Sequence, residues 1–524
     1  MTLTGLSHIG NHLAAPGATT FTAVNPATGE ALAPLYHAAG TAEVERACAL
    51  AAEAFPAYAA LPKSRRADFL RAIAAELESR AEAMAARVPQ ETGLPEVRAR
   101  GELARTCGQL RLFAALVEEG SWVDARIDEA DPARAPLPKP DVRSLLRPLG
   151  PVAVFAASNF PLAFSVAGGD TASALAAGCP VVVKAHSAHP GVSELAGQAV
   201  LAAARATGMP EGVFSLLFGA GQQVGAALVQ HPAIAAVGFT GSIPGGTALM
   251  RLAASRPVPI PVYAEMGSSN PFIVLPGALA AHAETIAEGL AQSVTQGTGQ
   301  FCTCPGLVFA IDGPGYARLR ERLRERLAAT APSAMLTPGI AASYRAGIAR
   351  LRAEPTLETL VHGDTEAGFG APALLETDAR AVLAKPELLH EVFGPSTLLV
   401  RCADRSELLR LARALEGQLT ATVHADAQEL GAWQELLAVL ETRAGRLLFG
   451  GYPTGVEVCH AMVHGGPFPA TADGRSTSVG TGAILRFARP VCYQNFPDAA
   501  LPRALQRANP DTLWRLVNGE RVRA

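Results

Sequence analysis

The sequence predicts a protein of the α/β class with two α/β domains and a small additional arm. Three observations lead to this prediction. From Gly150 onward, short apolar runs alternate with segments of helical length, and a similar alternation starts again near Gly267. A stretch rich in proline and charge, residues 124–147, precedes the first of these regions. Strands that alternate with helices form parallel sheets with helices packed on them.

The first α/β region contains four runs with the length and the β-branched or aromatic character of buried strands: Val152–Ala156, Val181–Lys184, Val213–Phe218 and Ile234–Phe239. Helical segments lie between them, for example Gly191–Thr207 and Gly221–His231. Parallel sheets bind ligands outside the carboxyl ends of their strands. We therefore expect ligand contacts in the loops that follow the strands, at Ser158-Asn159, Lys184–Ser187, Gly219–Gly225 and Gly241–Gly246.

The first 120 residues are predicted to be helical after an irregular start. Leu70, Ile73 and Leu77 share one helix face, and Ser64 is a candidate N-cap for that helix. Further along, four prolines fall within nine residues, 132–140. They favour extended backbone, and the segment is either a linker or an arm that crosses to a neighbouring subunit.

The second α/β region is predicted from the run Phe272–Leu275, a helical segment, and the run Leu307–Ile311. For the residues from Thr477 onward, which hold short strand-like and aromatic pieces, the sequence predicts no chemistry.

The composition is that of an ordinary packed globular chain, with 524 residues, 49% hydrophobic and 17% charged. A net charge of −3 offers no electrostatic footprint for nucleic acid or an acidic membrane, so a small molecule is the expected partner. No Lys or Arg precedes Arg46, so the basic start of a signal peptide is missing, and no apolar run reaches membrane-spanning length. Eight thinly spread cysteines do not suggest a disulfide framework, and we expect a reduced, cytoplasmic protein.

Two glycine-rich loops are candidates for a phosphate site. Gly219–Gly225 has the pattern G-x-G-x-x-x-G, one residue longer than the dinucleotide fingerprint, and a plain strand-to-helix turn is the preferred interpretation. Phe239–Gly246 is the better candidate. There small residues and the Ser242 hydroxyl open a helix directly after a strand, where backbone N–H groups bind phosphate.

Two further segments carry reactive groups. Glu265 ends an apolar run, where desolvation is expected to raise its pKa toward that of a general base; a helix cap or a solvated loop acid is the alternative. Cys302 lies in the bent loop Gly299–Gly306, where substrate can reach a thiolate. Two inert cysteines, Cys302 and Cys304, are the alternative to a reactive thiol. No second Cys/His pair with ligand spacing accompanies them, so no metal is predicted.

The order and spacing of five segments resemble the aldehyde dehydrogenase superfamily over nearly the whole chain. The segments are Ser158–Pro161, Lys184, Phe239–Ser242, Glu265–Gly267 with Cys302, and Glu391–Pro395. The resemblance implies the aldehyde dehydrogenase fold: a Rossmann-like NAD(P)-binding domain (residues 1–123 and 148–266), an α/β catalytic domain (267–470) and oligomerisation or bridging segments (124–147 and 471–524). It also implies a homodimer or homotetramer.

The resemblance implies the catalytic roles as well. Cys302, as thiolate, attacks the aldehyde carbon, and the Asn159 amide with the Cys302 backbone N–H holds the oxyanion. Hydride passes to the nicotinamide, and Glu265 activates the water that hydrolyses the thioester. The implied cofactor residues are Lys184 at the adenosine ribose, Ser242 at the pyrophosphate, Glu391 at the nicotinamide ribose and Phe393 beside the ring, with His186, Ser187, Gly225 and Gly241 around them.

The sequence departs from the family pattern at several positions. Ser158 replaces the Trp common before the catalytic Asn, which leaves the amide donor in place. Ser187 stands where members that prefer NAD⁺ often carry a Glu for the ribose 2′-hydroxyl. Without that carboxylate a 2′-phosphate is not repelled, and His186 or Ser187 can hydrogen-bond it, so NADP⁺ is slightly favoured over NAD⁺. Cys304 is expected to be an unreactive neighbour of Cys302, with a redox role as the alternative.

Within the superfamily, Gly150–Phe155, Ala157–Ser165, Tyr452–Val458, Met462–Pro467 and Asp473–Thr477 resemble the 2-oxoglutarate semialdehyde (2,5-dioxopentanoate) dehydrogenases. A related branch, the NADP-dependent long-chain fatty aldehyde dehydrogenases, shares much of the sequence of these segments and is the alternative. Phe164 is a candidate substrate residue. Arg475 is a candidate for the second carboxylate of a dioxo acid, with a structural role in the 465–474 loop as the alternative.

Two rival classes stay open. A cysteine hydrolase requires a His beside Cys302, which one of the 12 histidines can supply in space. A non-catalytic binding protein does not require Asn159, Glu265 and Cys302 to be present together.

Overall fold

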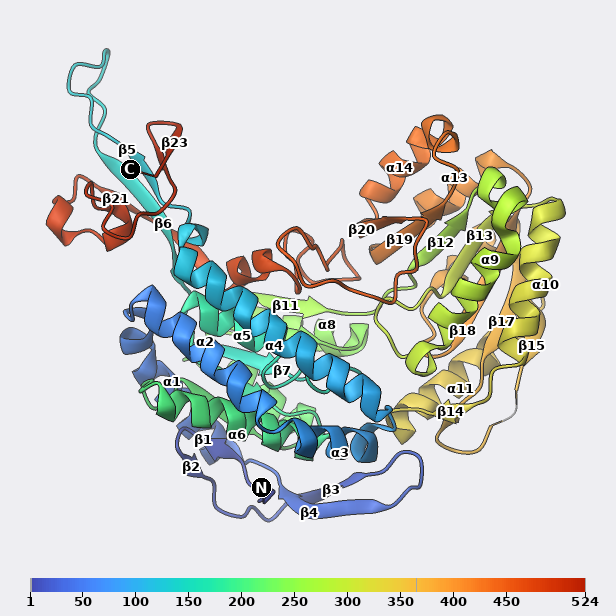
Figure 1. Cartoon of the computed structure of the whole chain (residues 1–524), viewed down its shortest axis with the longest axis horizontal. Helices are drawn as coiled ribbons and strands as arrows, with labels where there is room; N and C mark the ends of the chain where they lie inside the picture. Colours follow the sequence, from blue (N-terminus) through green and yellow to red (C-terminus); the bar gives the residue numbers. More distant parts are fainter. Residues whose placement is uncertain (1, 364, 524) are drawn as a thin grey trace.

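The computed structural model describes residues 2–363 and 365–523, which form two large lobes and an arm (Figure 1). The first lobe is built on a seven-stranded sheet in the order β11-β10-β7-β8-β9-β1-β2. Five strands are parallel: β7 (Val152–Phe155), β8 (Val181–Lys184), β9 (Phe214–Leu217), β10 (Ala236–Thr240) and β11 (Val262–Glu265). The antiparallel strands β1 (His8–Ile9) and β2 (His12–Leu13) complete one edge.

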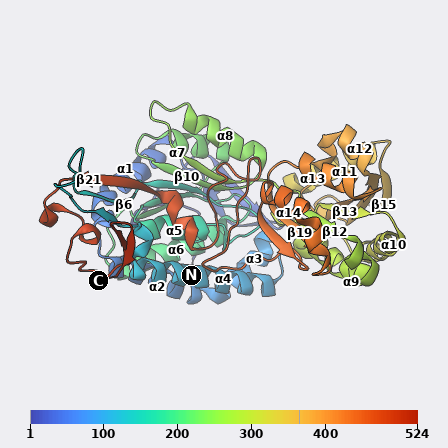
Figure 2. The same ribbon diagram turned by 90° about the horizontal axis from the view of Figure 1, so that it is seen from above.

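Both faces of this sheet are buried, because alternate side chains of each strand enter different cores. Val181 and Val183 pack in one core and Val182 in the other. Figure 2 shows α7 and α8 on one face of the sheet and α2, α4 and α6 on the other. The helices of this lobe are α1 (Thr41–Ala59), α2 (Lys63–Glu78), α3 (Ala81–Thr92), α4 (Glu96–Glu119), α5 (Gly169–Ala177), α6 (Pro190–Ala206), α7 (Ala226–Gln230) and α8 (Ile243–Ala254).

The strand order places a ligand crevice at the carboxyl ends of β7 and β10. From β7 the chain adds β8 and β9 on one side, then returns to add β10 and β11 on the other. The connections from these two neighbouring strands therefore leave in opposite directions, and the gap between them is where open α/β sheets bind ligands.

The second lobe contains a seven-stranded sheet in the order β15-β17-β18-β13-β12-β19-β20. Its strands are β12 (Pro271–Val274), β13 (Leu307–Ile311), β15 (Glu358–His362), β17 (Ala373–Asp378), β18 (Ser396–Cys402), β19 (Gln418–His424) and β20 (Ala444–Phe449). Its helices are α9 (Pro276–Thr295), α10 (Pro314–Ala328), α11 (Pro338–Arg352), α12 (Ala379–Ala384), α13 (Arg405–Ala414) and α14 (Gln434–Glu441). Alternation again divides the core, with Ile273 on one face of the sheet and Phe272 on the other.

The arm is a five-stranded sheet assembled from two distant parts of the chain. Its order is β21-β6-β5-β22-β23, with β5 (Arg126–Asp128), β6 (Val142–Pro148), β21 (Ala488–Gln494), β22 (Arg515–Val517) and β23 (Glu520–Val522). The proline-rich segment extends from the arm as a loop closed by the bridge Asp131–Lys139. Residues 471–487 lie instead on the first lobe, where η6 (Thr481–Phe487) packs against α5.

Small elements complete the structure. Two-stranded sheets are formed by β3 (Thr20–Val24) with β4 (Ala31–His37) and by β14 (Ser333–Ala334) with β16 (Phe369–Gly370). The short turns are η1 (Ser121–Val123), η2 (Gly221–Gly225), η3 (Gln296–Gly299), η4 (Pro386–Leu389), η5 (Glu429–Trp433), η7 (Asp498–Ala500) and η8 (Arg503–Leu505). Within the described ranges, no helix is both long and apolar enough for a bilayer span.

The α/β class and all six predicted strands are confirmed, with bounds within two residues. Two local predictions are wrong. Ser64 is not the N-cap of α2, because the helix begins at Lys63 behind Pro62 and Ser64 already lies inside it. The segment Gly221–His231 is not one helix but the π-helical turn η2 followed by the short α7.

Candidate active site

The loop that carries Cys302 follows α9 and η3. Gly299 has φ of +64°, and a Cβ on it would lie 2.3 Å from the Gly394 carbonyl carbon. Only glycine allows such a close backbone approach at positive φ. The Gln300 side chain fixes the turn by hydrogen bonds to two backbone groups. The Gly-Gln-x-Cys pattern therefore sets the local geometry that presents Cys302.

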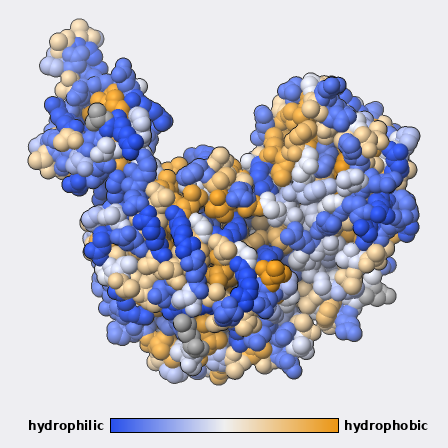
Figure 3. Space-filling view, in the orientation of Figure 1, coloured by the Kyte–Doolittle hydropathy of each residue, from blue (hydrophilic) through white to orange (hydrophobic). Residues whose placement is uncertain are grey.

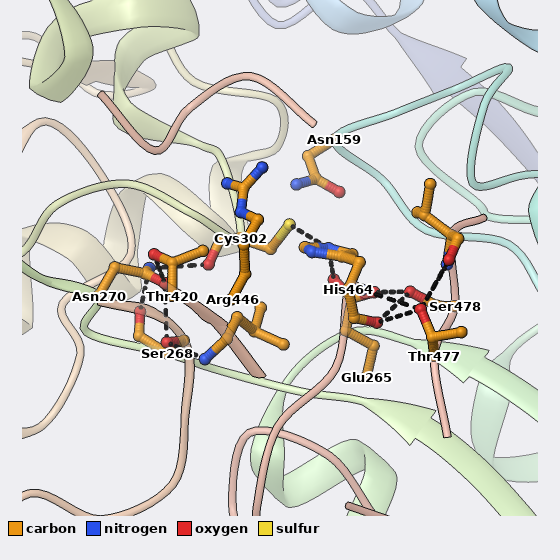
Figure 4. Close-up of polar contacts among 12 residues, drawn as sticks. Asn159, Glu265, Ser268, Asn270, Cys302, Thr420, Arg446, His464, Thr477 and Ser478 are labelled. Carbon is orange, nitrogen blue, oxygen red and sulfur yellow. Dashed lines mark hydrogen bonds and ion pairs between the residues drawn. The ribbon is translucent and has the colours of Figure 1, made fainter. Parts of the chain in front are cut away.

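Asn270 holds this loop from the second lobe. Its side-chain amide donates to the carbonyl oxygens of Cys302 (2.9 Å) and Cys304 (3.0 Å). Its own oxygen accepts from the Ser268 hydroxyl (2.9 Å) and the Thr420 hydroxyl (3.0 Å), as Figure 4 shows. The buried amide is fully hydrogen-bonded, so the backbone on both sides of the thiol is rigidly placed. The sequence analysis gave Asn270 no role.

Asn159 lies beside Cys302 with an amide hydrogen available for substrate. One hydrogen of its Nδ2 bonds the Gln300 carbonyl oxygen at 3.1 Å, which orients the amide. Among the described residues, no acceptor takes the backbone N–H of Cys302. Figure 4 shows the Asn159 amide next to the Cys302 sulfur. Two donors thus flank the thiol, as an oxyanion site requires.

Glu265 and Cys302 both contact one nitrogen of His464, Nε2. The Cys302 sulfur is 3.4 Å from His464 Nε2, and that nitrogen is 2.9 Å from Glu265 Oε1 (Figure 4). The side chains of His464 and Glu265 are almost completely buried. His464 was not among the residues expected to act in the site. Its position beside the thiol comes from the fold, since 162 residues separate it from Cys302.

The segment from Thr477 onward, for which no chemistry was predicted, completes the surroundings of Glu265. The Ser478 hydroxyl donates to Glu265 Oε2 at 2.6 Å and to the His464 carbonyl oxygen at 3.1 Å. Thr477 accepts the His464 backbone N–H at 2.8 Å. These bonds hold both His464 and the carboxylate in one orientation.

The expected rise in the pKa of Glu265 is wrong in its net direction. Burial raises the pKa, but the charge and hydrogen bond of His464 and the hydrogen bonds of Ser478 and Cys302 outweigh it, so the pKa lies below its usual value. Glu265 is therefore a carboxylate at neutral pH. Burial and the neighbouring Glu265 raise the pKa of Cys302 well above 9, so the resting group is a thiol.

Cys304 has the environment of an inert thiol. It is buried, its sulfur lies 3.7 Å from the Val294 carbonyl oxygen, and burial raises its pKa. Among the described residues, Glu265, Cys302 and His464 are the group whose ligand atoms lie near enough to hold a metal ion. Their mutual hydrogen bonds account for this proximity.

Lys184 and Ser242 lie at the carboxyl edge of the first sheet, where the cofactor residues were expected. Lys184 ends β8 and is buried. Its side-chain ammonium makes no hydrogen bond or ion pair with a described residue, and desolvation lowers the pKa of Lys184 to about 8. Ser242 is the exposed N-cap of α8, directly after Gly241. An unpartnered buried cation and an exposed helix N-terminus both fit the oxygens of a dinucleotide.

His186 and Ser187 follow Lys184, and Ser187 is exposed. The His186 ring stacks on His189 at 5.5 Å, and burial together with His189 and Lys184 lowers the pKa of His186 well below 6.5. His186 is thus neutral and offers a hydrogen bond but no charge. Gly225 is buried, and a Cβ there would lie 2.9 Å from the Phe155 ring, so packing on Phe155 explains this glycine.

Glu391 and Phe393 line a small cavity with Gly299 and Cys304. Burial raises the pKa of Glu391 to about 8. A Cβ at Gly267 would lie 2.4 Å from Oε2 of Glu391, so a larger residue there would displace the Glu391 side chain. Lys184 offers a cation, Ser242 a hydroxyl and Glu391 a carboxyl group. These three groups fit NAD(P).

The two candidate substrate residues have different outcomes. Phe164 is buried near the reactive groups, with its ring 6.2 Å from the His464 ring. Arg475 does not reach the site. Its side chain is 92% exposed and pairs with Asp473 at 3.1 Å, because the turn Asp473–Ser476 directs it to solvent.

Comparisons with known proteins agree with this geometry. Residues 13–466 match the model of the aldehyde dehydrogenase family. Alpha-ketoglutaric semialdehyde dehydrogenase 2 of Azospirillum brasilense is 55% identical over 99% of this chain and 100% of its own. Alpha-ketoglutaric semialdehyde dehydrogenase of Acinetobacter baylyi is 47% identical over 98% of each. The structure of 1-pyrroline-5-carboxylate dehydrogenase from Thermus with bound NAD has a TM-score of 0.79 at 24% identity, covering 94% of this chain and 92% of that one.

The chain belongs to the aldehyde dehydrogenase family, and the resemblance drawn from its motifs is confirmed. It is an oxidoreductase of a family that uses NAD(P). The two rival hypotheses, a cysteine hydrolase and a non-catalytic binding protein, are set aside on this finding. The hydrolase hypothesis required a histidine beside Cys302, and His464 does contact its sulfur.

The raised pKa of Cys302 gives the first testable prediction. In the free enzyme, alkylation of Cys302 by iodoacetamide is expected to increase about tenfold per pH unit between pH 6 and 8.5, because only the thiolate reacts. Peptide mapping by mass spectrometry measures the rate at each cysteine. Cys304, which is more deeply buried, is the internal control and should stay unmodified. A rate for Cys302 that is flat across this range would contradict the raised pKa.

Proposed function

We propose that the chain oxidises 2-oxoglutarate semialdehyde (2,5-dioxopentanoate) to 2-oxoglutarate with NAD(P)⁺, through a thioester on Cys302. The contact of the Cys302 sulfur with His464 and Glu265, beside the Asn159 amide, carries the proposed chemistry. The two relatives named for this semialdehyde, which align over nearly the whole chain, support the substrate. An NADP-dependent oxidation of long-chain fatty aldehydes is the alternative.

The reaction begins with the Cys302 proton. This proton passes to solvent, because His464 Nε2 donates its hydrogen to the Glu265 carboxylate at 2.9 Å and cannot accept another. The same N–H lies 3.4 Å from the sulfur and stabilises the thiolate that remains. The thiolate then attacks the aldehyde carbon and forms a thiohemiacetal. Asn159 Nδ2 and the Cys302 N–H bind the developing oxyanion; one such donor is worth roughly 10²–10³ in rate.

When bound, NAD(P)⁺ would supply the hydride acceptor that oxidation of the thiohemiacetal to a thioester requires. Lys184, Ser242 and Glu391 are the residues proposed to hold the dinucleotide. Glu265 then takes a proton from a water molecule whose oxygen attacks the acyl carbon, and the acid leaves as Cys302 regains a thiolate. The lowered pKa of Glu265 keeps it ionised and so able to accept that proton.

The proposal predicts which variants lose which step. With 2-oxoglutarate semialdehyde and either cofactor, absorbance at 340 nm should rise for the wild type. Cys302→Ala should abolish the signal while cofactor affinity stays unchanged. Glu265→Gln should retain a stoichiometric burst and lose at least roughly 10²-fold of the steady-state rate, because its base is missing. Stopped-flow and steady-state absorbance measure both phases.

The same assay distinguishes the alternatives. A panel that includes long-chain aldehydes tests the fatty aldehyde hypothesis. A higher kcat/KM for the long-chain aldehydes than for 2-oxoglutarate semialdehyde would support that hypothesis. Absence of reduced cofactor with every aldehyde, together with ester hydrolysis lost in His464→Asn, would mean that the protein is a cysteine hydrolase instead.

We also propose that NADP⁺ is slightly preferred over NAD⁺, on the basis of Ser187 and of the unpartnered Lys184 cation beside it. Ser187→Glu would place a carboxylate near the 2′-phosphate. Since close like charges cost several kcal/mol, kcat/KM for NADP⁺ should fall on the order of 10- to 100-fold. The value for NAD⁺ should change little, which is the control. Equal loss with both cofactors would contradict contact with the 2′-position.

The arm is proposed to join subunits into a homodimer or homotetramer. It exposes the large apolar side chains Leu137, Phe496 and Trp514, and β20 leaves an unpaired edge on the second sheet. Light scattering coupled to size-exclusion chromatography is expected to give two or four times 54.2 kDa. A monomer at micromolar concentration would contradict the proposal.

We further propose a reducing, cytoplasmic location, in keeping with eight free cysteines, which fractionation of cells tests.

A further inference from the structure

A groove of about 460 Å³ lies along the first half of α4, beside the loop that leads to Cys302. Its walls carry both charge and aromatic surface: Arg98, Glu102 and Arg105 from α4, Phe160 from the loop after Asn159, and Gln296 with Gly297 from η3. The volume is in the range that small ligands occupy. Figure 3 shows the molecular surface hollowed between the two lobes, with hydrophobic residues gathered in the hollow.

Aromatic rings connect this groove to the reactive groups. The Phe160 ring lies 5.3 Å from the Phe301 ring and 5.2 Å from the Phe164 ring, centre to centre. Phe301 directly precedes Cys302, and Phe164 lies against His464 at 6.2 Å. The residues that lie between the groove and the reactive groups are therefore aromatic.

Arg98 is fixed at the wall of the groove. Its guanidinium carbon is 4.5 Å from the centre of the Phe160 ring and 4.6 Å from that of Phe301. Its Nε is 3.6 Å from Glu102 Oε2, and its Nη2 is 3.5 Å from the Asn159 carbonyl oxygen. The planar cation is thus oriented by stacking and keeps donor groups for a further acceptor.

Arg105, two turns further along α4, lacks an acceptor. Its guanidinium carbon is 5.2 Å from the Phe164 ring centre, and its Nη1 is buried with no hydrogen-bond partner in the part of the chain that the structure describes. A buried donor left unpaired is costly, and a ligand oxygen would remove that cost. The charge of Cys302 acts on the pKa of both arginines, so both lie within electrostatic range of the nucleophile.

The local charge is positive. Glu102 is the carboxylate between the two arginines, and its Oε1 is already occupied by the backbone N–H groups of Leu162 and Ala163. Two guanidinium groups therefore face one carboxylate. Arg446 also acts on Cys302, but its two Nη groups donate to the Gly455 and Pro453 carbonyl oxygens, which commits them to the backbone.

We infer that Arg105, with Arg98, binds the carboxylate at the far end of the substrate, so that α4 selects aldehydes with a second acid group. The inference rests on the proposed function and names the subsite that Arg475 does not provide. In a five-carbon dioxo acid the aldehyde and carboxylate carbons are four bonds, or about 5 Å, apart. Arg98 contacts the ring of Phe301, the residue directly before Cys302, so the arginines begin one residue away from the thiol.

The test compares a charged and a neutral aldehyde of equal length. With Arg105→Met, kcat/KM for 2-oxoglutarate semialdehyde should fall on the order of 100-fold, mainly through KM, because a buried charge pair is lost. The value for pentanal should change by less than about threefold. Arg105→Lys should recover part of the loss, since the charge returns without the planar fork. Arg98→Met should lower both substrates' rates, since it also supports Phe301.

Arg475→Met is the matched control, an arginine removed from the exposed surface. Cofactor affinity, measured by fluorescence, reports whether each variant is folded. An equal loss for both aldehydes in Arg105→Met, or no loss for the semialdehyde, would overturn the inference.

Failure of the proposed function has a different signature. If the wild type prefers another carboxylate aldehyde, such as succinate semialdehyde, and Arg105→Met removes that preference, the proposed substrate is wrong but the arginine subsite stands. If the wild type prefers no carboxylate aldehyde over its neutral counterpart, both are wrong.

Discussion

The hydrogen bond between Glu265 and His464 joins the parts of the chain that make the active site. Glu265 ends a strand of the first lobe, His464 belongs to the segment that returns from the second lobe, and Cys302 comes from the loop after α9. Breaking this bond would leave Glu265 Oε1 without its donor in the protein interior, with Ser478 still bonded to the other oxygen, and this is destabilising. The thiol, the N–H beside it and the proposed base therefore have one common support.

That support also determines the electrostatics of the site. The hydrogen bonds of His464 and Ser478 keep Glu265 ionised despite its burial, and the ionised Glu265 in turn raises the pKa of Cys302. A resting thiol protects a buried nucleophile from oxidation, since the thiolate is the form that reacts. The N–H of His464, which lies 3.4 Å from the sulfur, is placed to stabilise the thiolate when it forms.

The proposed cofactor end and substrate end of the site belong to two different parts of the fold, the first sheet and helix α4. The first sheet presents an unpartnered Lys184 and the N-terminus of α8 at its carboxyl edge, where dinucleotides bind in open α/β sheets. Helix α4, which shares a hydrophobic core with that sheet, provides the arginines proposed to bind the substrate carboxylate. Changes in α4 can thus alter the choice of aldehyde without disturbing the cofactor edge.

The sequence by itself determined the α/β class and six strands of the two large sheets, and it pointed to Cys302 as the proposed nucleophile. Strand runs such as Val181–Lys184 are local, and the Gly299-Gln300-Phe301-Cys302 turn is specified by the conformations that its own residues allow. Asn159 and Glu265 were identified because their segments keep the order of the family. The tertiary structure alone decided the partners of these groups. His464, Ser478 and Asn270 act through contacts between residues far apart in the chain, which no local pattern encodes. For the same reason the sequence misjudged the pKa of Glu265 and placed Arg475 at the substrate, since exposure and hydrogen bonding depend on how the lobes pack.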